Sequence, residues 1–382
     1  MRIELVKDYD GMNIVASIVR YRDIDENFIK QWAGLESRAK NANAFLSPNF
    51  IIPAVKHLTP GMKPLFLVVN KKVGNVYTMI GMGVFVFSLG TIKFPLPHLK
   101  AYRTPHSYLG GLLIDDAYMK IFLDAIFDYL NSTRYLFGIE IVDQSMDTEF
   151  EKHMESSCVN NDMEWFMENS KQRAILIPKK VGEEYIRTNY SKNRLKALKR
   201  KYNHLLKYGE VRWDIVVGSQ VDGVVIDRFL KLENMGWKGK GGTSLLSKPG
   251  NEKFFREMIG NFSREERVYF TELSVNGQVI SSTSNLMSSQ AGFAFKIGWD
   301  SNYAQAGPGI LNEFEFIKNV ERLFHDLEYI DSGAGEGSYM DELWPDRIRL
   351  VSGIYASKCF AKPMMKVVNL ARRLKKSLPA FA

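Results

Sequence analysis

Cysteine is scarce in this sequence, whose 382 residues include only Cys158 and Cys359. These two lie far apart and form no CxxC motif or Cys/His cluster, so neither a disulfide framework nor a zinc site is indicated. The six histidines are scattered without metal-ligand spacing, and no Gly-x-Ser-x-Gly motif is present. We therefore expect no bound metal and no serine nucleophile of the hydrolase type.

Long apolar runs and nucleotide-binding motifs are also missing. No apolar stretch approaches the roughly 20 residues that cross a bilayer, and the start, MRIELVKDYDGMN, carries acids where a signal peptide is basic and then apolar. We expect a cytoplasmic protein. Neither GxxxxGK[ST] nor GxGxxG occurs, so ATP and dinucleotide sites are not indicated. The tail PMMKVVNLARRLKKSLPAF predicts a basic terminal helix that docks on its own domain or contacts an anionic membrane surface.

The apolar and charged residues that are present predict a two-domain globular protein. Apolar residues make up 45% of the chain and aromatic residues 12%, which suffices for ordinary buried cores. The formal net charge of +8 is unevenly shared, since residues 1–170 carry −3 and residues 171–382 carry +11. An anionic ligand is therefore expected on the second half.

The order of the hydrophobic patterns predicts an α/β fold. Strand-like and helical segments alternate in both halves, and Asn276-Gly277 between two apolar runs predicts a β-hairpin. A strand ending at Asp300, a helix over 309–325 and a strand over 327–333 predict a parallel crossover. We predict two domains, 1–170 and 171–382, each with a mixed central sheet flanked by helices.

One loop in this crossover has unusual composition. Between the strand FKIGW and the helix, the sequence AQAGPGIL places two glycines around a proline. Glycine lets a ligand approach the backbone, and the first N–H groups of a helix attract phosphate groups. A plain turn has the same composition. If the loop binds an anion, the predicted donors are the backbone amides of Ala306, Gly307, Gly309 and Ile310.

Four segments in the same order resemble the GNAT acyltransferase superfamily, specifically its FemAB-like and cellulose-biosynthesis (CelD-like) branch. They are SKNRLKALKRKYNHLLKYGEV (191–211), FLKLENMGWKGKGGTSL (229–245), Lys296 to Asp300 followed by Gly307 to Leu311, and IDSGAGEGSYMDELWPDR (330–347). The segment FLSPNFIIPAV of the first half resembles the branch more loosely. The chain departs from the family in having Gly307 where serine is usual, and Gln305 only echoes the family's Arg/Gln position.

The resemblance implies tandem GNAT-like domains, the first degenerate and on the acceptor side. It implies transfer of an acyl group from acyl-CoA or acetyl-CoA to an amine of a small molecule or amino sugar, in a role connected with surface polysaccharide or envelope assembly. The reaction would be direct attack in a ternary complex. Gln305 and the loop amides would hold the diphosphate of coenzyme A. No oligomeric state is implied.

Acyl transfer to an amine requires a proton acceptor, a polarised carbonyl and a proton for the leaving group. The candidate proton acceptors are Glu233, Asp300 and Asp331, and Asp331 is also a candidate substrate contact. Lys296 could stabilise the oxyanion, or simply extend its ammonium from an edge strand into water. Tyr303 is a candidate acid, although a packing role explains it better. Candidate acceptor contacts are Trp237, Lys238 and His106, each with a structural alternative.

The segment 191–207 predicts a helix with one packed face and one cationic face. It holds seven Lys/Arg residues and no acid. The cationic face is either simply solvated or binds an anionic partner. The FemAB branch uses aminoacyl-tRNA as donor, so tRNA is the second candidate partner. The third alternative is a binding protein without catalysis.

Overall fold

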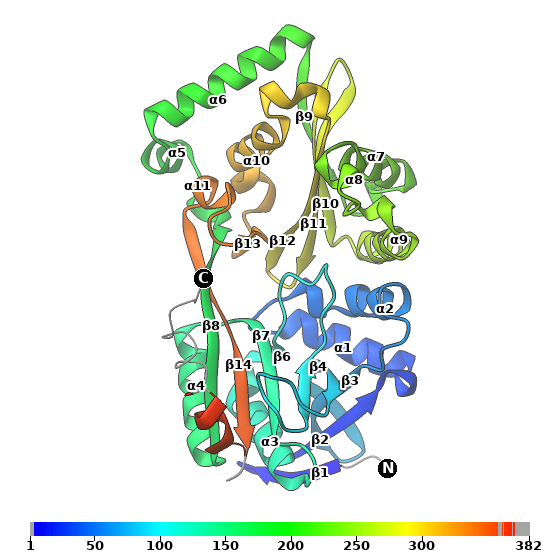
Figure 1. The fold of residues 1–382 in the computed structure, drawn as a ribbon, viewed down its shortest axis with the longest axis vertical. Helices are drawn as coiled ribbons and strands as arrows, with labels where there is room; N and C mark the ends of the chain where they lie inside the picture. The colour runs from blue at the N-terminus through cyan, green and yellow to red at the C-terminus, as the bar shows by residue number, and fades with distance from the viewer. Residues whose placement is uncertain (1–3, 358–360, 362, 369, 371–382) are drawn as a thin grey trace, which may run out of the picture. The chain divides into compact units, whose positions relative to one another are not determined.

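The computed structural model describes residues 4–357, 361, 363–368 and 370, and the described chain is mixed α/β (Figure 1). It divides into two compact units. Unit 1 contains the residues up to Pro48, Gly61–Gln172 and those from Arg349 onward, and unit 2 contains Asn49–Pro60 and Arg173–Ile348. Every helix in the described residues is too short or too polar to span a membrane.

This division differs from the two consecutive domains predicted, 1–170 and 171–382. Both divisions place a boundary near residue 172. In the structure, residues 49–60 also belong to unit 2, and the residues from Arg349 onward belong to unit 1. Helix α2 (Pro48–His57) packs in unit 2 through Phe50, whose ring centroid lies 5.2 Å from that of Phe254. Strand β14 (Asp346–Ser357) enters unit 1 and pairs antiparallel with β7 (Gly138–Ser145). These contacts join residues that are distant in the sequence, so no local sequence pattern predicts them.

Unit 1 is built on a sheet in the strand order β1-β2-β3-β4-β5-β7-β14, with β6 paired to β4. Helix α3 covers one face, where its Phe122 and Ile126 belong to the same buried cluster as Ile14 and Leu67 of the sheet. Helix α1 lies on the other face through Trp32, whose ring contacts Phe66. The remaining elements of unit 1 are β1 (Glu4–Tyr9), β2 (Met12–Arg20), α1 (Glu26–Arg38), β3 (Leu65–Val73), β4 (Val76–Ser88), β5 (His98–Ala101), β6 (Leu112–Ile114), α3 (Met119–Ser132), α4 (Thr148–Asn160) and β8 (Met163–Leu176).

Unit 2 is built on the strand order β8-β13-β12-β11-β10-β9, where β8 contributes its final residues. Its elements are α5 (Glu183–Asn189), α6 (Lys192–Leu205), β9 (Val211–Val217), α7 (Gly223–Met235), α8 (Trp237–Lys240), α9 (Pro249–Arg264), β10 (Val268–Val275), β11 (Gln278–Ser288), β12 (Ala291–Trp299), α10 (Pro308–Phe324), β13 (Tyr329–Asp331) and α11 (Met340–Leu343). Mixed sheets flanked by helices are the fold class that the sequence predicts, and the structure confirms it.

Two local predictions in unit 2 are confirmed. Strands β10 and β11 form an antiparallel hairpin closed by Asn276 and Gly277, both with positive φ (50° and 78°). Strands β12 and β13 pair in parallel and are connected by α10. A positive φ at both turn residues suits the twist of a hairpin, which explains the Asn-Gly pair.

Strand β12 contains a bulge that divides it into two parts with different surroundings. Ser284 pairs with Lys296 and Asn285 with Ala294, so Phe295 is the extra residue. The parallel pairing with β13 covers only residues 291–293. Within unit 2, residues 294–299 therefore have a strand neighbour on one side alone.

Candidate functional site

The turn between β12 and α10 has the backbone that its glycine predicts. Gly307 has φ 62° and ψ 59°, the left-handed region, and Pro308 is the first helical residue. The N–H of Gly307 is used, since it donates to the carbonyl of Ala304 at 3.0 Å. Pro308 has no N–H, and the amides of Gly309 and Ile310 point out of the first helical turn without intrahelical acceptors. Gln305 is exposed and Ala306 is buried.

A lysine from the basic helix reaches this turn. A Cβ placed on Gly307 would lie 3.0 Å from Lys201 Nζ and 3.5 Å from Lys201 Cδ. The positive end of a helix dipole disfavours a neighbouring cation. Among the residues that the structure describes, Lys201 makes no ion pair. The Lys201 ammonium and the N-terminal end of α10 therefore repel each other.

Helix α10 is held in place by a buried amide. The side chain of Asn312 accepts a hydrogen bond from Trp213 Nε1 at 2.8 Å and donates to the carbonyl of Thr271 at 3.3 Å. Asn312 is fully buried, so losing these partners would leave polar groups unsatisfied. These bonds tie the first two turns of α10 to β9 and β10.

Gly309 has a packing role in this arrangement. A Cβ built on Gly309 would lie 3.2 Å from Ile297 Cδ1 and 3.5 Å from Trp299 Cδ1. The absence of a side chain therefore lets the first turn of α10 lie directly on β12. A large substitution here would disturb this packing as well as any ligand.

The opposite face of β12 carries a group of charged side chains. Helix α7 approaches the strand at Gly298, where a Cβ would lie 2.5 Å from the backbone nitrogen of Glu233. Beyond the bulge, Lys296 and Gly298 share this face. The Lys238 ammonium donates to the carbonyl of Ile297 at 2.9 Å and lies 3.4 Å from Glu233 Oε1. The structure thus brings together three predicted site residues: Glu233, Lys238 and Lys296.

Two of these three groups are buried in ways that matter chemically. Glu233 is 2% exposed, and its Oε2 accepts a hydrogen bond from the amide of Leu245 at 2.8 Å. Burial lowers the pKa of Lys296 below its ordinary value, and the nearby Glu233 carboxylate opposes that shift. Desolvation favours the neutral amine of Lys296, while the carboxylate favours its ammonium form.

Asp300 and Tyr303 have structural contacts around the turn. Asp300 is 2% exposed, and its Oδ1 accepts the amide of Asn302 at 2.9 Å, so it caps the short 3-10 helix Ser301–Ala306. The Tyr303 ring packs on Tyr208, with centroids 5.1 Å apart. The packing of Tyr303 is the alternative that the sequence left open, and the side chain of Asp300 serves as a cap.

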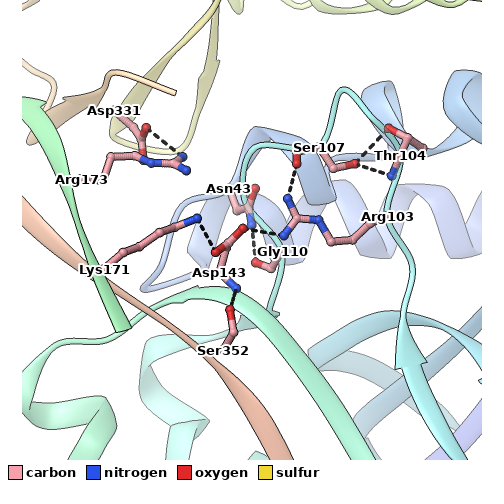
Figure 2. A network of polar contacts seen from close by, with 10 residues as sticks. All are labelled: Asn43, Arg103, Thr104, Ser107, Gly110, Asp143, Lys171, Arg173, Asp331 and Ser352. Carbon is pink, nitrogen blue, oxygen red and sulfur yellow. Dashed lines mark hydrogen bonds and ion pairs between the residues drawn. The ribbon is translucent and has the colours of Figure 1, made fainter. Parts of the chain in front are cut away.

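Asp331 forms a buried ion pair with a residue that the sequence did not single out. Its Oδ1 lies 3.4 Å from Arg173 Nη1 and accepts the amide of Gly333 at 2.6 Å, as Figure 2 shows for the ion pair. Both side chains are at most 5% exposed. The partnership joins two strands 158 residues apart in sequence, so no local pattern could reveal it.

Unit 1 holds a second charged group that sequence reasoning missed. Asp143 accepts from Arg103 Nη1 at 2.5 Å and lies 2.7 Å from Lys171 Nζ (Figure 2). Burial raises the pKa of Asp143, but the bonds from Arg103 and Lys171 outweigh burial and leave the pKa lowered. The carboxylate therefore stays ionised.

The remaining predicted residues lie as follows. His106 is buried in unit 1, and its backbone amide donates to Thr104 Oγ1 at 3.2 Å. The side chain of Trp237 and residues 371–382 of the basic tail lie outside the described residues. Among the described residues, no group of three His, Cys, Asp or Glu side chains is arranged to hold a metal ion.

Comparisons with known proteins bear on this site. Residues 192–340 match the family described as the acetyltransferase (GNAT) domain. This range contains Lys201, Glu233, Lys238, the bulge of β12 and the whole of α10. The comparison with curated proteins found no match.

Three solved structures are similar to the chain. FemX is 10% identical, with a TM-score of 0.56 over 89% of this chain and 98% of FemX. A conserved protein of unknown function from Bacteroides thetaiotaomicron is 12% identical, with a TM-score of 0.51 over 88% of this chain and 98% of that one. The C-terminal domain (DUF2156) of a putative lysylphosphatidylglycerol synthetase from Agrobacterium fabrum is 9% identical, with a TM-score of 0.50 over 90% and 95%.

At these identities the three structures show the fold alone. The family match and the shared fold together confirm the resemblance that the sequence motifs predict. Residues 192–340 are a GNAT-type acetyltransferase domain, in a chain with a FemX-like fold, and the chemistry of this domain class is acyl transfer.

Proposed function

We propose that the chain is an N-acyltransferase that moves an acyl group from acyl-CoA to an amine on a small molecule or amino sugar. The main observation behind the proposal is that the Lys201 ammonium lies close to the N-terminal turn of α10. An ammonium and a helix N-terminus repel each other, and a diphosphate offers each of them an opposite charge. The resemblance of the chain to the GNAT family suggests coenzyme A as the molecule that carries this diphosphate.

The free side of β12 supports the placement of the thioester. Residues 294–299 have no strand neighbour on the β13 side within unit 2, so backbone groups there can pair with an extended ligand. A backbone N–H of this segment would polarise the thioester carbonyl. Lys296, on the strand's α7 side, would add positive charge near the developing oxyanion.

The reaction proposed is direct attack in a ternary complex. The neutral amine attacks the thioester carbonyl, the carbon–sulfur bond breaks, and the thiolate leaves and takes up a proton. The attacking nitrogen loses one proton. Of the three predicted carboxylates, Asp300 caps a helix and Asp331 pairs with Arg173. Glu233 is our proposed proton acceptor, because its Oε1 accepts no hydrogen bond from the described residues and its carboxylate lies near Lys296, the proposed oxyanion-stabilising residue.

Gln305, Ala306, Gly307, Gly309 and Ile310 remain our proposed donor-binding residues, with Lys201 added. The N–H of Gly307 is bonded to the carbonyl of Ala304, so Gly307 would contribute its lack of a side chain rather than its amide. The Lys238 ammonium lies 3.4 Å from Glu233 Oε1, so we propose that Lys238 holds Glu233 in position. We propose that unit 1 serves the acceptor, with His106 among the residues near it. A cytoplasmic location, an envelope or polysaccharide pathway and membrane contact by the basic tail stay proposals.

An aminoacyl-tRNA donor is the second candidate function, favoured by helix α6. Its six basic residues between Lys192 and Lys201 are joined by no acid in the helix. Phosphate contacts by such a helix would make tRNA affinity fall steeply with salt. Coenzyme A carries far fewer phosphates, so its affinity would fall less.

Native mass spectrometry and thermal unfolding with coenzyme A, acetyl-CoA, longer acyl-CoAs and charged tRNA test the proposal. We expect a stoichiometric adduct and a raised melting temperature with an acyl-CoA, and acyl transfer to an amine when acceptors are added. Binding of aminoacyl-tRNA with a steep salt slope and no acyl-CoA adduct would favour the second candidate. A chain that binds neither donor is not a transferase of this kind.

A further inference from the structure

The loop between β4 and β5 of unit 1 exposes two large apolar side chains. Leu89 is 79% exposed and Ile92 is 95% exposed. The loop is nevertheless ordered, because the amide of Thr91 donates to the carbonyl of Phe94 at 2.8 Å and the amide of Phe94 donates to Thr91 Oγ1 at 3.0 Å. Phe94 anchors the loop, since its side chain is fully buried. An ordered loop therefore holds Leu89 and Ile92 in water.

A helical segment near the C-terminus exposes further apolar side chains. Its Ala361 and Met365 belong to one buried cluster with Phe94 of the loop. The described exposed residues of the segment follow the i, i+3, i+4, i+7 spacing of one helix face, and they are Pro363, Lys366, Val367 and Leu370. Val367 is 67% exposed and Leu370 is 60% exposed. The segment thus has one apolar face packed on unit 1 and a second apolar face in water.

The loop and the helical segment lie on the same side of the unit 1 sheet. Their shared cluster also contains Phe166 of β8 and Ile354 of β14. These two residues alternate along their strands with Trp165 and Tyr355, which pack in the core under α3. The cluster is therefore on the face opposite α3. We call the four exposed apolar side chains that the loop and the segment carry the apolar patch, which consists of Leu89, Ile92, Val367 and Leu370.

The charge beside the apolar patch is mostly positive. No Asp or Glu occurs in the two segments that carry the patch, 86–101 and 361–370. Lys100 and Lys366 are exposed and make no ion pair with a described residue. Lys93 lies 2.7 Å from Glu168 of β8, which balances its charge, and Glu164 is the other acid next to Phe166 on that strand. Two exposed lysines thus accompany the patch without a protein partner.

This combination of groups distinguishes a lipid surface from a protein partner. Protein–protein interfaces are depleted of Lys, whose ammonium is strongly hydrated. Segments that bind at a membrane surface instead combine large apolar side chains with Lys or Arg, because the apolar groups enter the headgroup boundary while the cations remain at the anionic headgroups.

We infer that the apolar patch docks the chain on a bilayer surface that contains anionic lipid. The four patch side chains enter the boundary between headgroups and acyl chains, and Lys100 and Lys366 lie among the headgroup phosphates. The contact is peripheral, since none of the helices in the described residues can span a membrane. The inference extends the tail contact proposed above to a described surface of unit 1. It does not depend on acyl transfer.

Sedimentation of the full chain with vesicles tests this inference. We expect binding to vesicles of phosphatidylglycerol and phosphatidylcholine in equal amounts, and binding at least about tenfold weaker to phosphatidylcholine alone. No donor or acceptor is added, so a failure here leaves the proposed acyl transfer untouched. Absence of binding to the mixed vesicles would overturn the inference. A dimer that forms without lipid and is lost in Ile92→Ser would assign the patch to an interface between copies and would overturn it too.

Variants at exposed positions locate the contact with little effect on folding. Leu89→Ser combined with Ile92→Ser should weaken binding to the mixed vesicles at least about tenfold, because two large apolar side chains no longer leave water. Lys366→Gln should weaken it about fivefold. The matched control is Val76→Ser, at a 65% exposed position at the other end of β4, and it should change binding less than about twofold. An equal loss in the Val76→Ser variant and the loop variant would refute the assigned surface.

Discussion

Lys201 Nζ lies 3.0 Å from the position that a Cβ of Gly307 would occupy, so a cation from α6 meets the N-terminal turn of α10. The two elements are separated in sequence by more than a hundred residues, and their meeting gives the basic helix a specific place in the site. A helix with seven basic residues over 191–207 could otherwise be a solvated surface. The contact distinguishes one lysine from its six neighbours.

Lys201→Met should weaken acyl-CoA binding by about 10- to 100-fold, because a hydrogen bond to a charged group contributes about 1.5–3 kcal/mol. Titration calorimetry measures the change. Lys196→Met is the matched control, since Lys196 is an exposed residue of the same helix. Equal losses in both variants would assign the effect to the overall charge of α6 and remove Lys201 from the donor site.

Gly307→Ala should lower the free energy of unfolding by about 1 kcal/mol, because φ of 62° is strained for any residue with a Cβ. The new methyl group would also displace Lys201, so donor affinity should fall as well. Gly309→Ala meets only Ile297 and Trp299 side-chain atoms, at 3.2 Å or more. It should change donor affinity less than Gly307→Ala does. Chemical denaturation and calorimetry compare the two variants, and the reverse order would contradict the assigned roles.

Lys296→Met should reduce turnover by about 100-fold or more while leaving acyl-CoA affinity nearly unchanged, if the amine stabilises the oxyanion. The pH dependence of the free energy of unfolding gives a second test of Lys296. The pKa of Lys296 is lowered in the folded state, so the unfolded state binds more protons and wild-type stability rises as pH increases toward 10.5. The variant should lose this part of the slope. Lys231→Met, at an exposed position of α7, should change neither turnover nor slope.

Asp300→Ala should cost about 1 kcal/mol of stability through loss of its cap, whereas Asp300→Asn keeps an oxygen acceptor and should be nearly neutral. Turnover of Asp300→Asn decides its chemical role. Retained activity is expected of a capping residue. A loss of 100-fold or more in a stably folded Asp300→Asn would make Asp300, rather than Glu233, the proton acceptor.

The buried carboxyl group of Glu313, on α10, should make the free energy of unfolding depend on pH. Burial raises its pKa to about 7 from 4.5, so the folded state binds more protons than the unfolded state between these values. Stability should therefore fall as pH rises from about 4.5 to 7, by at most about 3 kcal/mol. Glu313→Gln should remove this fall, while the exposed Glu321→Gln should keep it. Denaturation of both variants at pH 5 and pH 8 provides the measurement, and an unchanged slope in Glu313→Gln would refute the assignment.

Much of the local structure of unit 2 could be predicted from the sequence, because it depends on the conformational preferences of neighbouring residues. Asn276-Gly277 closes a hairpin because both residues tolerate positive φ, and Gly307-Pro308 begins α10 because glycine permits the left-handed turn and proline needs no hydrogen bond. The α/β class followed from hydrophobic periodicity, and the GNAT resemblance followed from four ordered segments. Each of these features is recognised from short segments of the chain, without knowledge of which distant segments meet.

Tertiary structure alone decided which distant residues share a site and where the units begin and end. The sequence could not place Lys201 at Gly307, pair Arg173 with Asp331, or bring Lys238 to the carbonyl of Ile297. It also could not assign residues 49–60 to unit 2 or the chain from Arg349 to unit 1. The physical reason is the same throughout, because burial of apolar surface and pairing of buried charges act between segments whose separation along the chain leaves no periodic signal.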